Sequence, residues 1–277
     1  MPDVPQFIKN GEINKWHYFA WVKKLGYKLI KNVQIEIGGR IIDTHYGDWL
    51  NIWNELSLVR NKNVRKSIDQ MIGHIPDMYN FTNGKDGRQL YIPLQFWFCR
   101  NNGLALPLIA LANNDVKIHI EFNELKSCSI LGPTHSITLQ EDIVHLQQFE
   151  YLEQSTLFGN ASGLFIDYDI VTKKLYYVQV ENQFQIPTYD NQNSSSFIIT
   201  GQTSQVEVHP KLDTNIVPIN VTMPTNLNLL DVKLIVDYIY LDNQERLKFY
   251  QHKHEYLIET LQATSEKTLT SNNIQET

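Results

Sequence analysis

The chain has 277 residues, enough for one large or two medium domains, and 42% of them are hydrophobic, so a buried core is expected. Its aromatic fraction of 11% favours strands. The net charge of −6 gives no basic surface for the phosphates of nucleic acid and argues against direct wrapping of nucleic acid.

The N-terminus and the cysteines indicate the compartment. The opening Met-Pro-Asp-Val-Pro lacks a charged stretch followed by an apolar core, which predicts no secretory signal. The two cysteines, Cys99 and Cys128, are interpreted as reduced structural thiols rather than a disulfide or a metal site. These features predict a protein that is made and folded in a reducing cytoplasm.

The first 46 residues contain one clear element. Residues 1–31 fit a helix or a packed loop equally well. A β-hairpin is predicted over residues 33–43, because Val33, Ile35 and Ile37 alternate with polar residues. The Gly38-Gly39 pair can adopt the positive φ angles of a two-residue turn. A phosphate-binding loop is a weaker interpretation, since its third glycine and its lysine are missing.

A short helix is predicted behind Asp48, which is interpreted as its N-cap. An apolar stripe runs along this helix with helical spacing and consists of Trp49, Ile52, Trp53 and Leu56. His45 and Asp48 are candidate catalytic residues. The favoured interpretation is that Asp48 caps the helix and His45 packs or bonds locally.

A polar surface loop is predicted over residues 57–89, and the most apolar stretch follows at 90–122. Two prolines and a turn at 101–103 interrupt this stretch, so no run reaches the ~20 residues that span a bilayer. Residues 91–98 are predicted to be a buried strand. Residues 116–122 alternate without a break and predict a half-buried strand.

The second half of the chain contains further strand patterns. Residues 127–138 are predicted to be a linker around Gly132-Pro133. Residues 139–160 fit either a helix or a strand with a loop. A hairpin is predicted over 164–180, and an exposed loop over 187–196.

A strand is predicted over residues 232–241, followed by a helix as far as residue 262. Asp242 and Glu245 form a capping-box pattern at the start of that helix. Its predicted apolar face consists of Tyr250, His254, Leu257, Ile258 and Leu261. The rest of the chain is polar and predicts a frayed tail.

Two constellations invite a chemical interpretation. His252, His254 and Glu259 resemble part of a cupin metal motif, but residues two apart point to different sides of a helix. Asp167 and Asp169 share one face of a strand and are interpreted as solvated. We therefore predict no catalytic, cofactor-binding or metal-binding residue, no cofactor and no enzymatic activity.

Three segments resemble the major capsid proteins of the nucleocytoplasmic large DNA viruses. The first is the hairpin and helix at 33–56. The second, at 90–125, includes the run Arg-Asn-Asn-Gly-Leu-Ala-Leu-Pro-Leu-Ile-Ala-Leu from Arg100 to Leu111. The third, at 232–262, includes Val-Asp-Tyr-Ile-Tyr-Leu-Asp-Asn-Gln-Glu-Arg from Val236 to Arg246.

This resemblance implies a mainly β fold with two consecutive antiparallel jelly rolls and short helices. The first would cover residues 1–126, without its N-terminal strands, and the second would cover 139–277, without its C-terminal strands. Such a chain is a truncated or split form of the family subunit. Either another chain would then supply the missing strands or this chain would assemble poorly, because unpaired sheet edges favour association.

The resemblance also implies a structural role. The chain would form homotrimeric capsomers that tile an icosahedral virion shell near an inner membrane, with other capsid proteins as partners and assembly in the host cytoplasm. Two alternatives stay open. One is a jelly-roll carbohydrate-binding or attachment protein that uses exposed aromatics such as Tyr189; the other is a cupin-like metalloenzyme.

Overall fold

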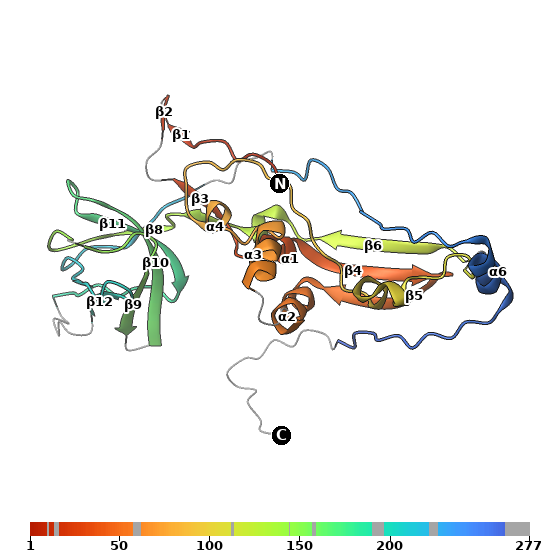
Figure 1. The fold of residues 1–277 in the computed structure, drawn as a ribbon. Helices are drawn as coiled ribbons and strands as arrows, with labels where there is room; N and C mark the ends of the chain where they lie inside the picture. The colour runs from red at the N-terminus through yellow and green to blue at the C-terminus, as the bar shows by residue number, and fades with distance from the viewer. Residues whose placement is uncertain are drawn as a thin grey trace, which may run out of the picture. The chain divides into compact units, whose positions relative to one another are not determined.

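The computed structural model describes residues 1–9, 11–13, 17–57, 62–111, 114–143, 145–156, 159–189, 197–221 and 227–263 (Figure 1). The chain divides into two compact units, and each consists of three separate segments of sequence. Unit 1 comprises Met1–Leu29, Arg60–Ile92 and Asn123–Lys233, and unit 2 comprises Ile30–Val59, Pro93–Phe122 and Leu234–Thr277.

Unit 1 is dominated by a seven-stranded antiparallel sheet in the order β13-β12-β9-β10-β11-β8-β14. Its strands, in chain order, are β8 (His135–Thr138), β9 (Tyr151–Thr156), β10 (Gly159–Asp169), β11 (Lys174–Glu181), β12 (Ile199–Gly201), β13 (Glu207–Val208) and β14 (Val217–Pro218). The predicted hairpin over 164–180 is confirmed as β10 and β11. The ambiguous region 139–160 contains strand β9, and no helix lies in its described part.

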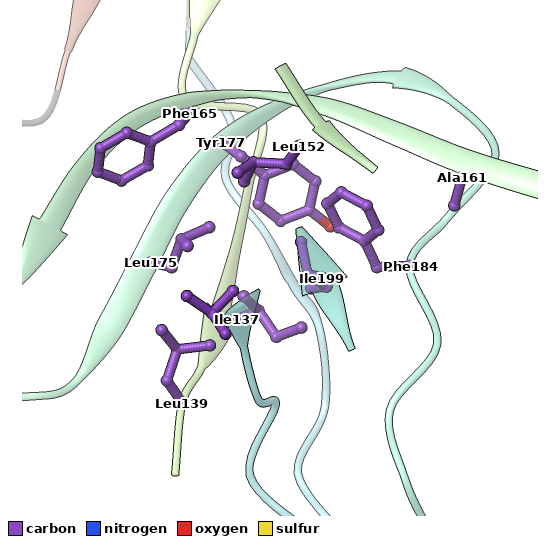
Figure 2. Close-up of a cluster of buried hydrophobic side chains, with 10 residues drawn as sticks. Ile137, Leu139, Leu152, Ala161, Phe165, Leu175, Tyr177, Phe184 and Ile199 are labelled. Atoms are coloured by element: carbon purple, nitrogen blue, oxygen red, sulfur yellow. The ribbon is translucent and has the colours of Figure 1, made fainter. Parts of the chain in front are cut away.

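A bulge in β10 allows this one strand to contribute buried side chains to two hydrophobic clusters. The register with β11 shifts between Phe165 and Asp167, so Phe165 and Ile166 are both buried although they are neighbours. Phe165 belongs to the larger cluster, shown in Figure 2, in which Tyr177 and Phe184 pack with ring centroids 4.9 Å apart. Ile166 belongs to a smaller cluster with Ala20, Phe81 and Val178.

The rest of unit 1 consists of short elements. These are β1 (Ile8–Lys9), β2 (Glu12–Ile13), β3 (Tyr18–Trp21), α1 (Leu25–Leu29), α3 (Lys62–Met71), α4 (Pro76–Tyr79), the 3-10 helix η2 (Leu125–Cys128) and β7 (Ser129–Gly132). Residues 1–31 thus contain strands as well as a short helix. Trp21 and Leu25 are buried there.

Two predictions for unit 1 need correction. The region 57–89 contains helices α3 and α4. Val64, Ile68 and Met71 recur with helical spacing along α3. The predicted linker 127–138 contains strands β7 and β8, which pair with β3 and β11. Gly132 packs closely there, since a Cβ atom at this position would lie 2.7 Å from Val178 Cγ2.

Unit 2 contains a three-stranded antiparallel sheet in the order β5-β4-β6. Strands β4 (Ile30–Ile37) and β5 (Arg40–Tyr46) form the predicted hairpin, and β6 (Val116–Phe122) is the predicted alternating strand. The turn residues Gly38 and Gly39 have φ angles of +57° and +80°, so the expected two-residue turn is confirmed.

The helices of unit 2 are α2 (Gly47–Ser57), α5 (Trp97–Arg100), the 3-10 helix η1 (Asn102–Leu104) and α6 (Asn243–Gln251). Helix α2 buries a different face from the predicted one. It buries Leu50 and Asn54, whereas Ile52 and Leu56 of the predicted stripe are 51% and 70% exposed. The helix begins at Gly47, so Asp48 lies in its first turn rather than at the N-cap.

Two further predictions in unit 2 are wrong. Residues 91–96 are irregular and lead into α5 instead of forming a strand. Phe96 and Trp97 are buried there by side-chain packing, without a neighbouring strand. Helix α6 ends at Gln251 instead of residue 262, and His254 Nε2 lies 2.9 Å from the Phe249 carbonyl oxygen near that end.

Residues 232–241 are not a strand in the structure, and Figure 1 draws them as coil leading into α6. The exposed loop 187–196 falls mostly outside the described residues, as do the tail beyond 263 and Trp16.

The fold class is confirmed as mainly β, with antiparallel sheets and short helices. The two compact units interleave along the chain. Interleaving arises because pairs such as β3 with β7 and β4 with β6 join segments that are far apart in sequence.

Candidate functional site

A buried polar pair, Asp43 and His45, lies on β5 of unit 2. The two residues are two apart on a strand and so share one face, and His45 Nε2 lies 2.9 Å from Asp43 Oδ2. The His45 ring stacks on Phe96 with centroids 4.5 Å apart. Burial lowers the pKa of His45, although the Asp43 carboxylate acts to raise it. The ring is therefore neutral at neutral pH.

The second oxygen of Asp43 holds the C-terminal segment, which we define as residues 252–263. Asp43 Oδ1 accepts hydrogen bonds from the backbone N–H groups of Thr44 and Leu261, each at 2.9 Å. Glu259 forms an ion pair with Arg100, whose guanidinium lies 4.1 Å from the ring centroid of Trp53. These two contacts attach this segment to the rest of unit 2.

This geometry is that of a structural pair rather than of a catalytic one. A catalytic Asp–His pair needs a nucleophile at the second ring nitrogen. Within the described residues, His45 Nδ1 has no hydrogen-bond partner, and Phe96 covers the ring. His45 therefore has local contacts, as expected: its ring stacks on Phe96 and lies beside Asp43 of the same strand. Sequence reasoning did not single out Asp43. The signal that could have found it is the Asp-x-His spacing on a strand.

The residues of the cupin-like motif do not converge. His252 follows the end of α6, His254 stacks on Phe249, and Glu259 pairs with Arg100. In the part of the chain that the structure describes, no group of three or more His, Cys, Asp or Glu residues is arranged to hold a metal ion.

The other singled-out residues have separate local contacts. Asp167 accepts a hydrogen bond from the Tyr18 hydroxyl, whereas Asp169 binds the turn between β10 and β11 through Thr172. Cys99 is exposed and Cys128 is buried, and both are free thiols.

A buried carboxylate that sequence reasoning missed lies in unit 1. Glu150 is 5% exposed and accepts four hydrogen bonds. The donors are the N–H groups of Gln147 (2.6 Å), Thr203 (3.0 Å) and Ser204 (2.8 Å) and the Ser204 hydroxyl (2.8 Å). Burial opposes ionisation, but the hydrogen bonds prevail and lower the pKa of Glu150. The carboxylate is a cross-link between loops.

A run of exposed apolar side chains lies at 234–241 in unit 2, and we call it the apolar segment. Its large side chains are between 50% and 91% exposed; they are Leu234, Ile235, Val236, Tyr238, Ile239 and Tyr240. A contiguous exposed apolar surface marks a site of interaction. No helix among the described residues is both long and apolar enough to cross a bilayer.

The described sheets are antiparallel, and the buried carboxylates described above hold loops and segments in place. The chain belongs to the major capsid protein family: a family model described as "Major capsid protein N-terminus" matches residues 4–242.

Relatives from large DNA viruses extend this finding. The chain is 40% identical to "Probable capsid protein 4" of Acanthamoeba polyphaga mimivirus, over 100% of this chain and 55% of that protein. It is 31% identical to the "Major capsid protein" of Pyramimonas orientalis virus, over 97% of this chain and 42% of that protein. The chain thus spans about half the length of these relatives.

A solved structure is also similar. The quasi-atomic model of the PBCV-1 virus capsid matches 89% of this chain and 39% of the matched chain, with 22% identity and a TM-score of 0.40.

Proposed function

We propose that this chain is a structural component of the icosahedral shell of a large DNA virus. The observation that carries the proposal is the match to the N-terminal part of major capsid proteins over residues 4–242. The 40% identity to a mimivirus capsid protein extends along the whole chain. The role is non-enzymatic, in keeping with Asp43, His45 and Glu150, whose contacts hold the fold together.

The proposed partners are polypeptides. The chain forms homotrimeric capsomers, which contact one another and other capsid proteins in the shell. Its net charge of −6 favours these partners over nucleic acid. The shell lies near an inner membrane, and assembly takes place in the host cytoplasm. The division into jelly rolls at 1–126 and 139–277 stays a prediction.

Immunogold electron microscopy of purified virions tests the proposal. An antibody against this chain is expected to label the shell of intact particles at a regular density. Labelling confined to the particle interior, or to infected-cell material outside particles, would overturn it.

A carbohydrate-binding role has one observation in its favour, since Tyr189 is 67% exposed. A glycan-binding screen with the purified chain tests it. Binding that Tyr189→Ala abolishes would support an attachment function, and an absence of binding would remove that candidate.

A further inference from the structure

A hollow of about 370 Å³ lies in the surface of unit 1, beside helix α3 (Figure 1). Small ligands bind in hollows of about 300–1,000 Å³, so this one has room for a compact ligand. Its lining comes from α3 and from residues 74–76, around the start of α4. The lining residues on α3 are Lys62, Arg65, Lys66, Asp69 and Gln70.

The charge around this hollow is mainly positive. Arg65 and Lys66 follow Lys62 at i+3 and i+4, so all three cations lie on one side of α3, with Cβ atoms about 5–6 Å from that of Lys62. All three residues are exposed. Asp69 is the one carboxylate among the lining residues. The hollow thus has three cations against one carboxylate.

The positive charge of the two lysines is not neutralised by a carboxylate. Among the described residues, neither Lys62 nor Lys66 forms an ion pair. Like charges at i and i+4 of a helix repel each other, and a cation in the first turn opposes the helix dipole. Helix α3 has no acidic residue in its first turn to offset this cost. An anion bound between the lysines would relieve the repulsion.

We propose that this hollow is a binding site for a compact oligophosphate, that is, a small molecule or headgroup with two or more neighbouring phosphate groups. The planar guanidinium of Arg65 suits two phosphate oxygens at once, and Lys62 and Lys66 add two point charges. Each phosphate group carries about −1.5 to −2 charges, so an oligophosphate matches several cations better than a single carboxylate does. The proposal is independent of a role in the virion shell.

The charge of the whole chain favours a compact ligand over nucleic acid. The net charge is −6, so a long polyanion that extends beyond the hollow meets repulsion from the rest of the chain. A small anion remains within reach of the three cations and avoids this repulsion.

Isothermal titration calorimetry of the full chain with inorganic triphosphate tests the proposal. We expect saturable binding of one triphosphate per chain, which weakens as the salt concentration rises. Lys62→Gln combined with Lys66→Gln should weaken this binding about 10- to 100-fold, because charged hydrogen bonds are lost. Lys62→Arg combined with Lys66→Arg should retain it, because both charges remain.

The matched control is Lys211→Gln combined with Lys253→Gln. These two lysines are exposed outside the hollow, so the control changes the net charge equally and should leave binding intact. Circular dichroism should show the same fold in every variant, since α3 buries no residue. Equal weakening by the control pair, unchanged binding after loss of Lys62 and Lys66, or an absence of triphosphate binding would overturn the proposal.

Hydrogen–deuterium exchange locates the bound anion. With triphosphate at ten times its dissociation constant, exchange through opening of α3 should slow about 10-fold, because the anion binds only the closed helix. Exchange across β10 and β11 should stay as it is. Slower exchange at another site, with none at α3, would contradict the assignment of the hollow.

Two further titrations distinguish the sources of the phosphate groups. Phosphatidylcholine vesicles that contain phosphatidylinositol 4,5-bisphosphate present them as a lipid headgroup. Binding to triphosphate and to these vesicles supports the site with a headgroup as its ligand, whereas binding to triphosphate alone supports it with a free oligophosphate. Duplex DNA that binds more tightly than triphosphate, and is released by the loss of Lys62 and Lys66, would replace the proposal with a nucleic-acid site.

Discussion

At the scale of single residues, two buried carboxylates hold distant segments together. Glu150 joins the loop before β9 to the turn at 201–204, and Asp43 joins β5 to the C-terminal segment. Each carboxylate accepts hydrogen bonds from at least two backbone N–H groups, and those donors would be left unsatisfied if the carboxylate were removed.

Glu150→Gln is expected to lower the free energy of unfolding by about 2–4 kcal/mol, because an amide has one oxygen for donors that two oxygens now serve. Chemical denaturation measures this change. Glu153→Gln is the matched control, since Glu153 is exposed on the neighbouring strand and should change stability by less than about 0.5 kcal/mol.

The same carboxylate predicts a pH dependence. Its pKa is lower in the folded than in the unfolded chain, so its stabilisation is complete above the unfolded pKa of about 4.3. It is lost as the pH falls through the folded value. Glu150→Gln should therefore flatten the acid side of the stability profile, and an unchanged profile would contradict this account.

Asp43→Asn should loosen the C-terminal segment. Loss of the charge weakens the hydrogen bond from Leu261 N, so exchange of that amide should accelerate about 10-fold. The comparison is Glu259→Gln, which breaks an exposed ion pair and should have little effect. Equal effects of the two substitutions would show that Asp43 is not the main attachment.

At the scale of elements, the hairpin β4–β5 depends on its glycine turn. Gly39→Ala is expected to cost about 1 kcal/mol, because φ is +80° there and the surrounding space is open. Gly38→Ala should cost more, since its Cβ would lie 2.5 Å from Asn114 Oδ1.

Thermal unfolding of these two variants, and of Gly38→Ala combined with Asn114→Ala, measures the difference. The second substitution should bring the cost at Gly38 down to that at Gly39. If the two glycines respond equally in the presence of Asn114, the close contact has no energetic role.

The cap of α6 gives a separate prediction. Asp242→Ala removes the hydrogen bond to Glu245 N and should cost the helix about 1 kcal/mol. Amide exchange across 243–251 should then rise about fivefold. Asp231→Ala removes only an exposed pairing with Lys233 and should leave that exchange as it is.

Elements with local signals could be predicted from the sequence. Apolar and polar residues alternate in the hairpin over 33–43, the strand at 116–122 and the hairpin over 164–180. Each of these strands also has a neighbouring strand to pair with in its sheet. The segment 232–241 alternates too, but a strand also needs a neighbour, and none of the described strands pairs with it.

Other differences came from contacts that periodicity does not encode. The sequence shows the apolar stripe on α2, but the face of the helix that is buried depends on its packing against β4 and β5. As a result, Asn54 is buried instead of Leu56. Glu150 lies in a region without a clear pattern, so its four donors could not be foreseen. Asp43 was predictable, because Asp-x-His on a strand places both groups on one face.

At the scale of the whole molecule, the two units are uneven in their burial. Among the described residues, unit 1 has a seven-stranded sheet with a large apolar cluster, whereas the sheet of unit 2 has three strands and the apolar segment is exposed. The family model that matches residues 4–242 includes this exposed segment.

The most direct test of this account is a cryo-electron microscopy reconstruction of the virion shell. We predict that the shell contains density that fits three parts of this structure with side-chain agreement: the pair of strands β3 and β7, the seven-stranded sheet of unit 1 and the three-stranded sheet of unit 2. This density should repeat three times in each capsomer. A shell whose capsomers are fully explained by other chains, with no density for this sequence, would contradict the account.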